Sequence, residues 1–295
     1  TYRWTSLTNA TLVPEDGFDE PLTISDGGIL RTQVWHYPSR SECMSCHTPV
    51  GGFAIGFNTA QLNRDYGTNG NQIEELSRAG YFTAPVSNVH SYRALASVTN
   101  EAVSREWRVR SYLAGNCAQC HQPGGPALGF WNASVSNDTA QAGLINGPLN
   151  NPLGNPDARV IVPGSLTNSM LLTRMGIRGL LQMPPLATSL ADIDALALFS
   201  AWITNDLAAG WTNTIDPLNI SLRATNNGAT VEFIQPANRA YRVETATNLT
   251  LPIAWHFINT PDNRPTYPAT NTPASVNDPA TNTSQKFLRV RVSAP

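Results

Sequence analysis

Two copies of one five-residue pattern decide how this chain is organised. The first copy is CMSCH at residues 43–47, and the second is CAQCH at residues 117–121. Together they use all four cysteines of the 295-residue chain and two of its five histidines. Four cysteines are too few to form a disulfide framework that stabilises a chain of this length. Their spacing indicates a different role.

The spacing Cys-x-x-Cys-His is the attachment sequence of c-type haem. Its two thiols form thioether bonds to the porphyrin, and its histidine ligates the iron. Two cysteines three positions apart lie on one side of a helical turn, so they can reach neighbouring substituents on one edge of the ring. The sequence therefore predicts two covalently bound haem c groups, held by Cys43, Cys46, His47, Cys117, Cys120 and His121.

Two other uses of paired cysteines fit this pattern less well. Zinc ribbons usually separate their cysteine pairs by about 15–20 residues, whereas about 70 residues separate the two pairs here. Redox disulfides would not require a histidine directly after both pairs. Haem attachment explains all six residues at once.

The iron of the second haem needs a ligand on its far face, and we expect Met183 to supply it. Met183 precedes Pro184 and Pro185, which hold the chain extended and fix where the thioether points. It lies just before a helical pattern at 191–206. A core-filling role is the alternative for Met183, and Met175 is the rival ligand.

The far-side ligand of the first haem is less determined, because no methionine lies between His47 and Cys117. His36 precedes Cys43 by seven residues, a stretch that spans roughly 20 Å and reaches round a haem edge. His90 follows later in the chain. We favour His36, with His90 and an open or water-bound site as alternatives.

The apolar pattern changes along the chain. Helical periodicity predicts helices at 59–64, 72–78, 105–113, 169–175 and 191–206, after strand-like stretches at 1–5, 22–25 and 30–37. Period-two alternation predicts strands at 218–223, 230–234, 240–245, 254–258 and 287–292, with a surface loop at 261–284.

From these patterns we expect a multidomain α+β protein. Residues 1–100 would form a first haem domain with N-terminal strands, and residues 101–212 a second, cytochrome c-like haem domain. Both haem domains would be mainly α-helical. Residues 213–295 would form a small antiparallel β-sandwich.

Composition excludes several classes of partner. The chain has 19 basic and 21 acidic residues and a net charge of −2, which disfavours nucleic acid and polybasic membrane binding. No apolar run approaches the ~18–20 residues of a transmembrane helix, and no signal peptide is visible in residues 1–10. The basic residues are 18 arginines and Lys286, so the lysine-ringed docking face of mobile cytochromes is absent and a fixed or fused redox partner is favoured.

Residues 1–206 resemble a family of secreted bacterial two-haem c-type cytochromes of planctomycete and verrucomicrobial type. The resemblance implies that the methionine of the Met-Pro-Pro module is a far-side haem ligand, and that members are encoded beside or fused behind quinoprotein dehydrogenases. Residues 241–244 and 287–292 are similar to fibronectin-like modules of secreted enzymes. The matching segments are 37–43, 58–64, 109–113, 116–125, 162–165, 169–171, Arg174, 183–186 and 202–203.

We therefore expect an electron carrier rather than an enzyme, passing single electrons between a periplasmic or extracellular redox donor and an acceptor. The donor could be a quinoprotein dehydrogenase to which the chain is fused or docked. Export is expected because bacteria attach haem c outside the cytoplasmic membrane. The alternatives are a diheme cytochrome c peroxidase-like enzyme, with Glu42 and Glu101 as weak acid–base candidates, and a structural unit of an extracellular cytochrome assembly.

Overall fold

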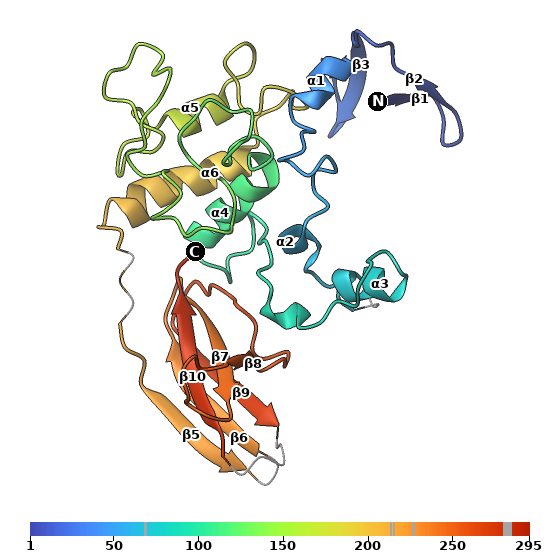
Figure 1. Ribbon diagram of the computed structural model, residues 1–295. Helices are drawn as coiled ribbons and strands as arrows, with labels where there is room; N and C mark the ends of the chain where they lie inside the picture. The colour runs from blue at the N-terminus through green and yellow to red at the C-terminus, as the bar shows by residue number, and fades with distance from the viewer. Residues whose placement is uncertain (68–69, 213, 215, 226–227, 280–284) are drawn as a thin grey trace. The chain divides into compact units, whose positions relative to one another are not determined.

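The computed structural model describes residues 1–295 except 68–69, 213, 215, 226–227 and 280–284 (Figure 1). The chain forms two compact units. Unit 1 contains Thr1–Ile55, Asn116–Ser134 and Ala142–Ala209, and unit 2 contains Gly56–Gly115, Val135–Gln141 and Gly210–Pro295. The predicted domains at 1–100, 101–212 and 213–295 stay a prediction.

Unit 1 begins with two antiparallel hairpins, in which β1 (Tyr2–Trp4) pairs with β2 (Ala10–Leu12) and β3 (Phe18–Asp26) with β4 (Ile29–Tyr37). Gly27 and Gly28 alone join β3 to β4, and both have positive φ angles of 57° and 85°. A two-residue turn of this kind matches the twist of the strands and suits glycine. The hairpin therefore delivers His36, near the end of β4, to the segment that carries the first cysteine motif.

The helices of unit 1 are short. They are α1 (Arg40–Met44), α5 (Met170–Gly176) and α6 (Ile193–Ala201), with α6 continuing into a π-helical segment, η2 (Trp202–Leu207). Helices α5 and α6, with the continuation η2, contribute to the core of the unit, whereas α1 has no buried residue. Asp192 caps α6 by accepting a 2.9 Å hydrogen bond from the Ala195 amide. Phe199 and Trp202 are fully buried, and α5 contacts α6.

Unit 2 contains the helices α2 (Thr59–Leu62) and α3 (Gln72–Arg78), the 3₁₀ turn η1 (Val89–Ser91), and α4 (Arg105–Asn116) up to Gly115. The Asn71 side chain caps α3 by accepting a 3.0 Å hydrogen bond from the Ile73 amide. This helix has the bounds that periodicity predicts.

Two three-stranded antiparallel sheets complete unit 2. One has the order β5 (Ile220–Thr225), β6 (Gly228–Gln235), β9 (Thr272–Pro279), and the other the order β10 (Phe287–Ser293), β7 (Ala240–Ala246), β8 (His256–Phe257) (Figure 1). They share one apolar core, in which the rings of Phe233 and Tyr241 meet edge to face at 4.8 Å.

Helix α4 is joined to these sheets within unit 2. The Trp107 ring lies 4.4 Å from the Tyr267 ring, and the Ser104 amide donates a 2.8 Å hydrogen bond to the Tyr267 carbonyl. The buried Glu106 carboxylate accepts hydrogen bonds from Trp211 Nε1 at 3.1 Å and Asn238 Nδ2 at 2.6 Å. The sheets are therefore packed against the helix and not merely appended to the chain.

The expected fold class, with two mainly α-helical cytochrome c-like haem domains, is wrong. Helices make up 19% of the described residues, which form six α-helices, none longer than 12 residues, and four small antiparallel sheets. Helices are present in the segments where periodicity predicts them, but these helices are short. The long segments between them, rich in glycine, proline and asparagine, form loops and do not extend the helices.

The interpretation of 261–284 as a surface loop is also wrong, because β9 lies within it and pairs with β6. Ala274, Val276 and Asp278 are buried at alternate positions. Pro273 and Pro279 obscured this period-two signal, but an edge strand tolerates proline. Residues 280–284 lie outside the described residues.

Among the described residues, none of the helices combines the length and apolar character needed to cross a membrane.

Candidate functional site at the two cysteine motifs

Unit 1 brings the two cysteine motifs into contact. Cys46 Sγ lies 3.7 Å from Cys120 Sγ, although the residues are 74 positions apart in the sequence. Cys120 Sγ is also 3.8 Å from the Ser45 carbonyl oxygen, and Gln122 Nε2 donates a 3.2 Å hydrogen bond to the Val50 carbonyl. All four cysteines are free thiols.

Glycine permits this close approach. A Cβ atom at Gly51 would lie 2.9 Å from the Cys46 carbonyl oxygen and 3.3 Å from that of Gln119, which belongs to the other motif. A Cβ at Gly129 would lie 3.3 Å from Cε1 of His121. Larger residues at either position would push the loops away from the motifs.

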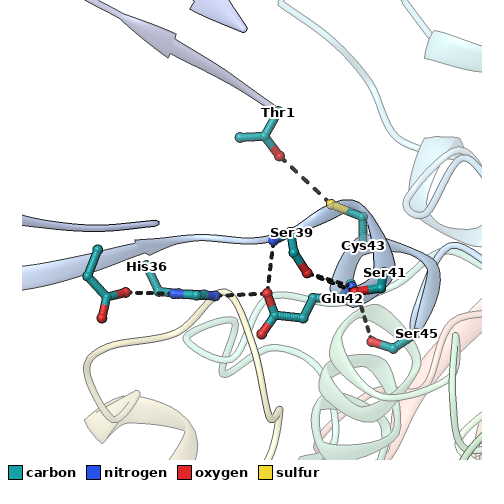
Figure 2. Close-up of polar contacts among 8 residues, drawn as sticks. Thr1, His36, Ser39, Ser41, Glu42, Cys43 and Ser45 are labelled. Atoms are coloured by element: carbon teal, nitrogen blue, oxygen red, sulfur yellow. Dashed lines mark hydrogen bonds and ion pairs between the residues drawn. The ribbon is translucent and has the colours of Figure 1, made fainter. Parts of the chain in front are cut away.

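The first motif is built on α1, whose N-terminus is capped by a reciprocal pair of hydrogen bonds (Figure 2). The Ser39 hydroxyl accepts from the Glu42 amide at 3.1 Å, and Glu42 Oε2 accepts from the Ser39 amide at 2.8 Å. Cys43 lies in this helix, and its Sγ is 3.8 Å from Thr1 Oγ1. The cap thus fixes the helical turn on which the first thiol is presented.

His47 is oriented for ligation by its backbone neighbour. Its Nδ1 lies 2.5 Å from the Phe53 carbonyl oxygen. A carbonyl only accepts, so Nδ1 must donate, and in the neutral ring Nε2 keeps the lone pair that a metal needs. An imidazole held at one nitrogen, with no hydrogen-bond partner at the other among the described residues, is typical of metal-ligating histidines.

The second motif follows directly after α4 and is more deeply enclosed. Burial raises the pKa of the Cys117 thiol to about 12, and burial together with nearby Cys46 raises the pKa of Cys120 to about 12. Burial also lowers the pKa of His121 to about 4, so its imidazole is neutral near neutral pH. A neutral imidazole is the form that ligates metals.

His121 stacks on Trp131, with the ring centres 4.1 Å apart and the planes at 20°. Its Nδ1 is buried and has no hydrogen-bond partner among the described residues. Burial of an unpaired polar atom is costly, which makes it a feature that requires an explanation. Sequence reasoning missed Trp131, although an aromatic residue ten positions after the motif histidine was available as a signal.

Met183 lies in unit 1 with both motifs and is half-buried. Its amide donates a 2.9 Å hydrogen bond to the Arg174 carbonyl in α5, which fixes the backbone of the Met-Pro-Pro segment. The rival Met175 is buried in α5. The assignment of Met183 as a ligand stays a prediction.

His36 is held between two carboxylates (Figure 2). Its Nδ1 lies 2.6 Å from Asp19 Oδ1, and its Nε2 lies 3.0 Å from Glu42 Oε2. These hydrogen bonds raise the pKa of His36, and the bond from His36 is the largest cause that lowers the pKa of Glu42 to about 2. A protonated ring has no lone pair for iron, so the predicted ligation by His36 would require it to release a carboxylate.

His90, the alternative ligand, lies in η1 of unit 2. Arg264 Nε donates a 2.9 Å hydrogen bond to His90 Nδ1, and burial lowers the pKa of the ring. The ring is therefore neutral with its proton on Nε2. Neither far-side alternative for the first haem is tested by this geometry.

The described residues bring together no cluster of three or more histidine, cysteine or acidic side chains suited to hold a bare metal ion. Comparison of the chain with family models, with curated proteins and with solved structures finds no match.

Proposed function

We propose that this chain is a diheme c-type cytochrome that carries single electrons between a redox protein donor and a redox protein acceptor. The observation that carries the proposal is the contact between the two Cys-x-x-Cys-His motifs, whose Cys46 and Cys120 sulfur atoms lie 3.7 Å apart. Haem bound at each motif would supply a centre that takes up and releases one electron. Because the two attachment sites are in contact, electrons would pass readily between the two haems of one chain.

The side chains of both motifs fit covalent haem. All four thiols are free for thioether bonds. His47 is held at Nδ1 by the Phe53 carbonyl and leaves Nε2 for iron, and His121 is kept neutral by burial. His47 and His121 would be the near-side ligands, with Met183 and His36 as the proposed far-side ligands.

Exposed apolar side chains on the loops beside the motifs also fit a porphyrin. Val50 and Phe53 follow the first motif and are 42% and 55% exposed, and Leu128 and Phe130 follow the second and are 82% and 67% exposed. Exposed apolar groups gathered near one site indicate that something covers them. These side chains would be available to contact bound haem and to exclude water from it.

The proposal implies a cellular location for the protein and a type of redox partner. Covalent haem attachment in bacteria occurs outside the cytoplasmic membrane, so the protein would act in the periplasm or at the cell surface. A single lysine and a net charge of −2 give little long-range steering. A fused or docked partner, such as a quinoprotein dehydrogenase, therefore suits the chain better than one that diffuses to it.

No observation favours the peroxidase alternative as a second function. Glu42, one of its two acid–base candidates beside Glu101, is paired with His36, and its pKa is lowered to about 2. A general acid works best with a pKa near the operating pH.

A redox titration followed by visible absorption tests the proposal. We expect two one-electron steps in the intact protein and one step in each of the double variants Cys43→Ala/Cys46→Ala and Cys117→Ala/Cys120→Ala. The matched control is Met44→Ala, an exposed residue inside the first motif, which should keep both steps. A purified, exported protein without any reducible visible band would contradict the proposal.

A further inference from the structure

The sulfur contact between the motifs joins cysteines that hold the same place in each pattern. Cys46 and Cys120 are both the second cysteine of a Cys-x-x-Cys-His sequence, and their Sγ atoms lie 3.7 Å apart. The contact is supported on both sides, because Cys120 Sγ also lies 3.8 Å from the Ser45 carbonyl oxygen and Gln122 is hydrogen-bonded to the Val50 carbonyl. The pairing therefore belongs to the packing of two loops.

A disulfide between these atoms requires little movement. The sulfur atoms of a disulfide are about 2.05 Å apart, so the two thiols must approach by less than 2 Å. Both residues are half-buried and not enclosed, which leaves them accessible to a small oxidant. Cys43 lies beside Thr1 instead, with its Sγ 3.8 Å from the threonine hydroxyl.

We propose that, in the chain before haem is attached, Cys46 and Cys120 form a disulfide that joins the two motifs. A low-molecular-weight disulfide is the oxidant. One thiol attacks it, forms a mixed disulfide and releases one molecule of the small thiol. The other cysteine then displaces the second molecule, so that two protein thiols are oxidised and one small disulfide is reduced to two thiols.

This bond would control both motifs together. It occupies one thioether position in each, so neither motif can make its full set of haem bonds until a thiol reductant cleaves the bridge. Only this consequence rests on the proposed function. The bridge itself rests on the contact between the two thiols.

Tryptic mapping of the haem-free full-length chain tests the bridge. The chain is made where haem is not attached, equilibrated with oxidised and reduced glutathione, alkylated and digested without reductant. Cleavage after Arg40, Arg64, Arg110 and Arg159 places the motifs in peptides 41–64 and 111–159. We expect these peptides to be linked by one disulfide, with Cys43 and Cys117 alkylated.

Cysteine variants identify the linked atoms. The double variant Cys43→Ser/Cys117→Ser should keep the link, and the matched double variant Cys46→Ser/Cys120→Ser should lose it. Haem content of the exported protein is measured separately, so a chain that cross-links and carries no haem would refute the proposed function alone. Disulfides within each peptide, or four alkylated cysteines in folded protein under the same oxidising conditions, would overturn the bridge.

Discussion

The side-chain amide of Asn238 donates a 2.6 Å hydrogen bond to the carboxylate of Glu106, 132 positions earlier in the chain. Trp211 Nε1 donates a second bond, of 3.1 Å, to the same buried oxygen. The nearby Arg110 is fully buried, and burial lowers its pKa to about 10, while Glu106 acts in the opposite direction. Glu106 thus joins α4 to the loops of the β-sheets and partly neutralises a buried guanidinium.

We expect Glu106→Gln to lower the free energy of unfolding by about 2 kcal/mol, because bonds to a charged acceptor become bonds to a neutral amide. Urea unfolding followed by tryptophan fluorescence measures the change. The matched control is Glu232→Gln, whose carboxylate forms an exposed pair with Arg223 and should change stability by less than about 1 kcal/mol. Equal losses in the two variants would contradict the role of Glu106.

Tyr267 provides a second test of this packing. Its hydroxyl donates a 3.2 Å hydrogen bond to the Ala294 carbonyl in a buried position, and its ring packs on Trp107. Tyr267→Phe keeps the ring and leaves the carbonyl unpaired, so we expect a loss of about 1 kcal/mol. Tyr81→Phe, at a residue that is 71% exposed, is the control, expected within about 0.5 kcal/mol of the parent. A Tyr267→Phe protein as stable as its parent would refute the hydrogen bond's contribution.

The pair of His36 and Glu42 predicts a pH dependence. The folded-state pKa of His36 is raised, so its contribution is fully present below its unfolded value of about 6.5 and is lost as pH rises through the folded value. The pKa of Glu42 is lowered to about 2, so its contribution is present above about 4.3 and is lost as pH falls towards 2. The pair therefore stabilises most between these limits.

A histidine titration by nuclear magnetic resonance measures this in the haem-free chain. Glu42→Gln should move the pKa of His36 downwards, whereas Glu15→Gln, which removes a carboxylate from the neighbouring exposed pair with Arg40, should leave it in place. Iron-bound His36 would not titrate in the haem-loaded protein. A His36 that still titrates there, with a raised pKa, would rule it out as the far-side ligand of the first haem.

Met183→Ala tests the ligand of the second haem. If Met183 binds the iron, the variant should lose the near-infrared methionine–iron band and the potential of the second haem should fall, because methionine ligation raises it. Met44→Ala is the control, since Met44 is exposed on α1. A Met183→Ala protein that keeps the band would refute the assignment and leave Met175 as the candidate.

Local patterns predicted the elements of this protein better than its architecture. Periodicity located the helix at Gln72–Arg78 and the strand at Phe287–Ser293, give or take a residue. The error lay in the fold class, because helices of the predicted lengths cover too little of the chain to make either haem domain mainly α-helical. Strand β9 was missed because Pro273 and Pro279 concealed an alternation of small buried residues.

For the candidate site too, the sequence predicts local features but not tertiary contacts. The spacing of the cysteines indicates which six residues act together, because that information is local. The contact of Cys46 with Cys120 is a tertiary one across 74 positions, and no spacing rule contains it. The pairing of His36 with Asp19 depends on the register of β3 and β4, in which the two residues face each other.

The mass of tryptic peptides from the exported protein tests the central claim most directly. Peptides 41–64 and 111–159 each contain one complete motif and no other cysteine. We predict that each peptide carries the mass of one haem, retained after acid extraction because the bonds are covalent. Peptides of unmodified mass, or haem on neither motif of a protein isolated from a host that attaches haem c, would contradict the account.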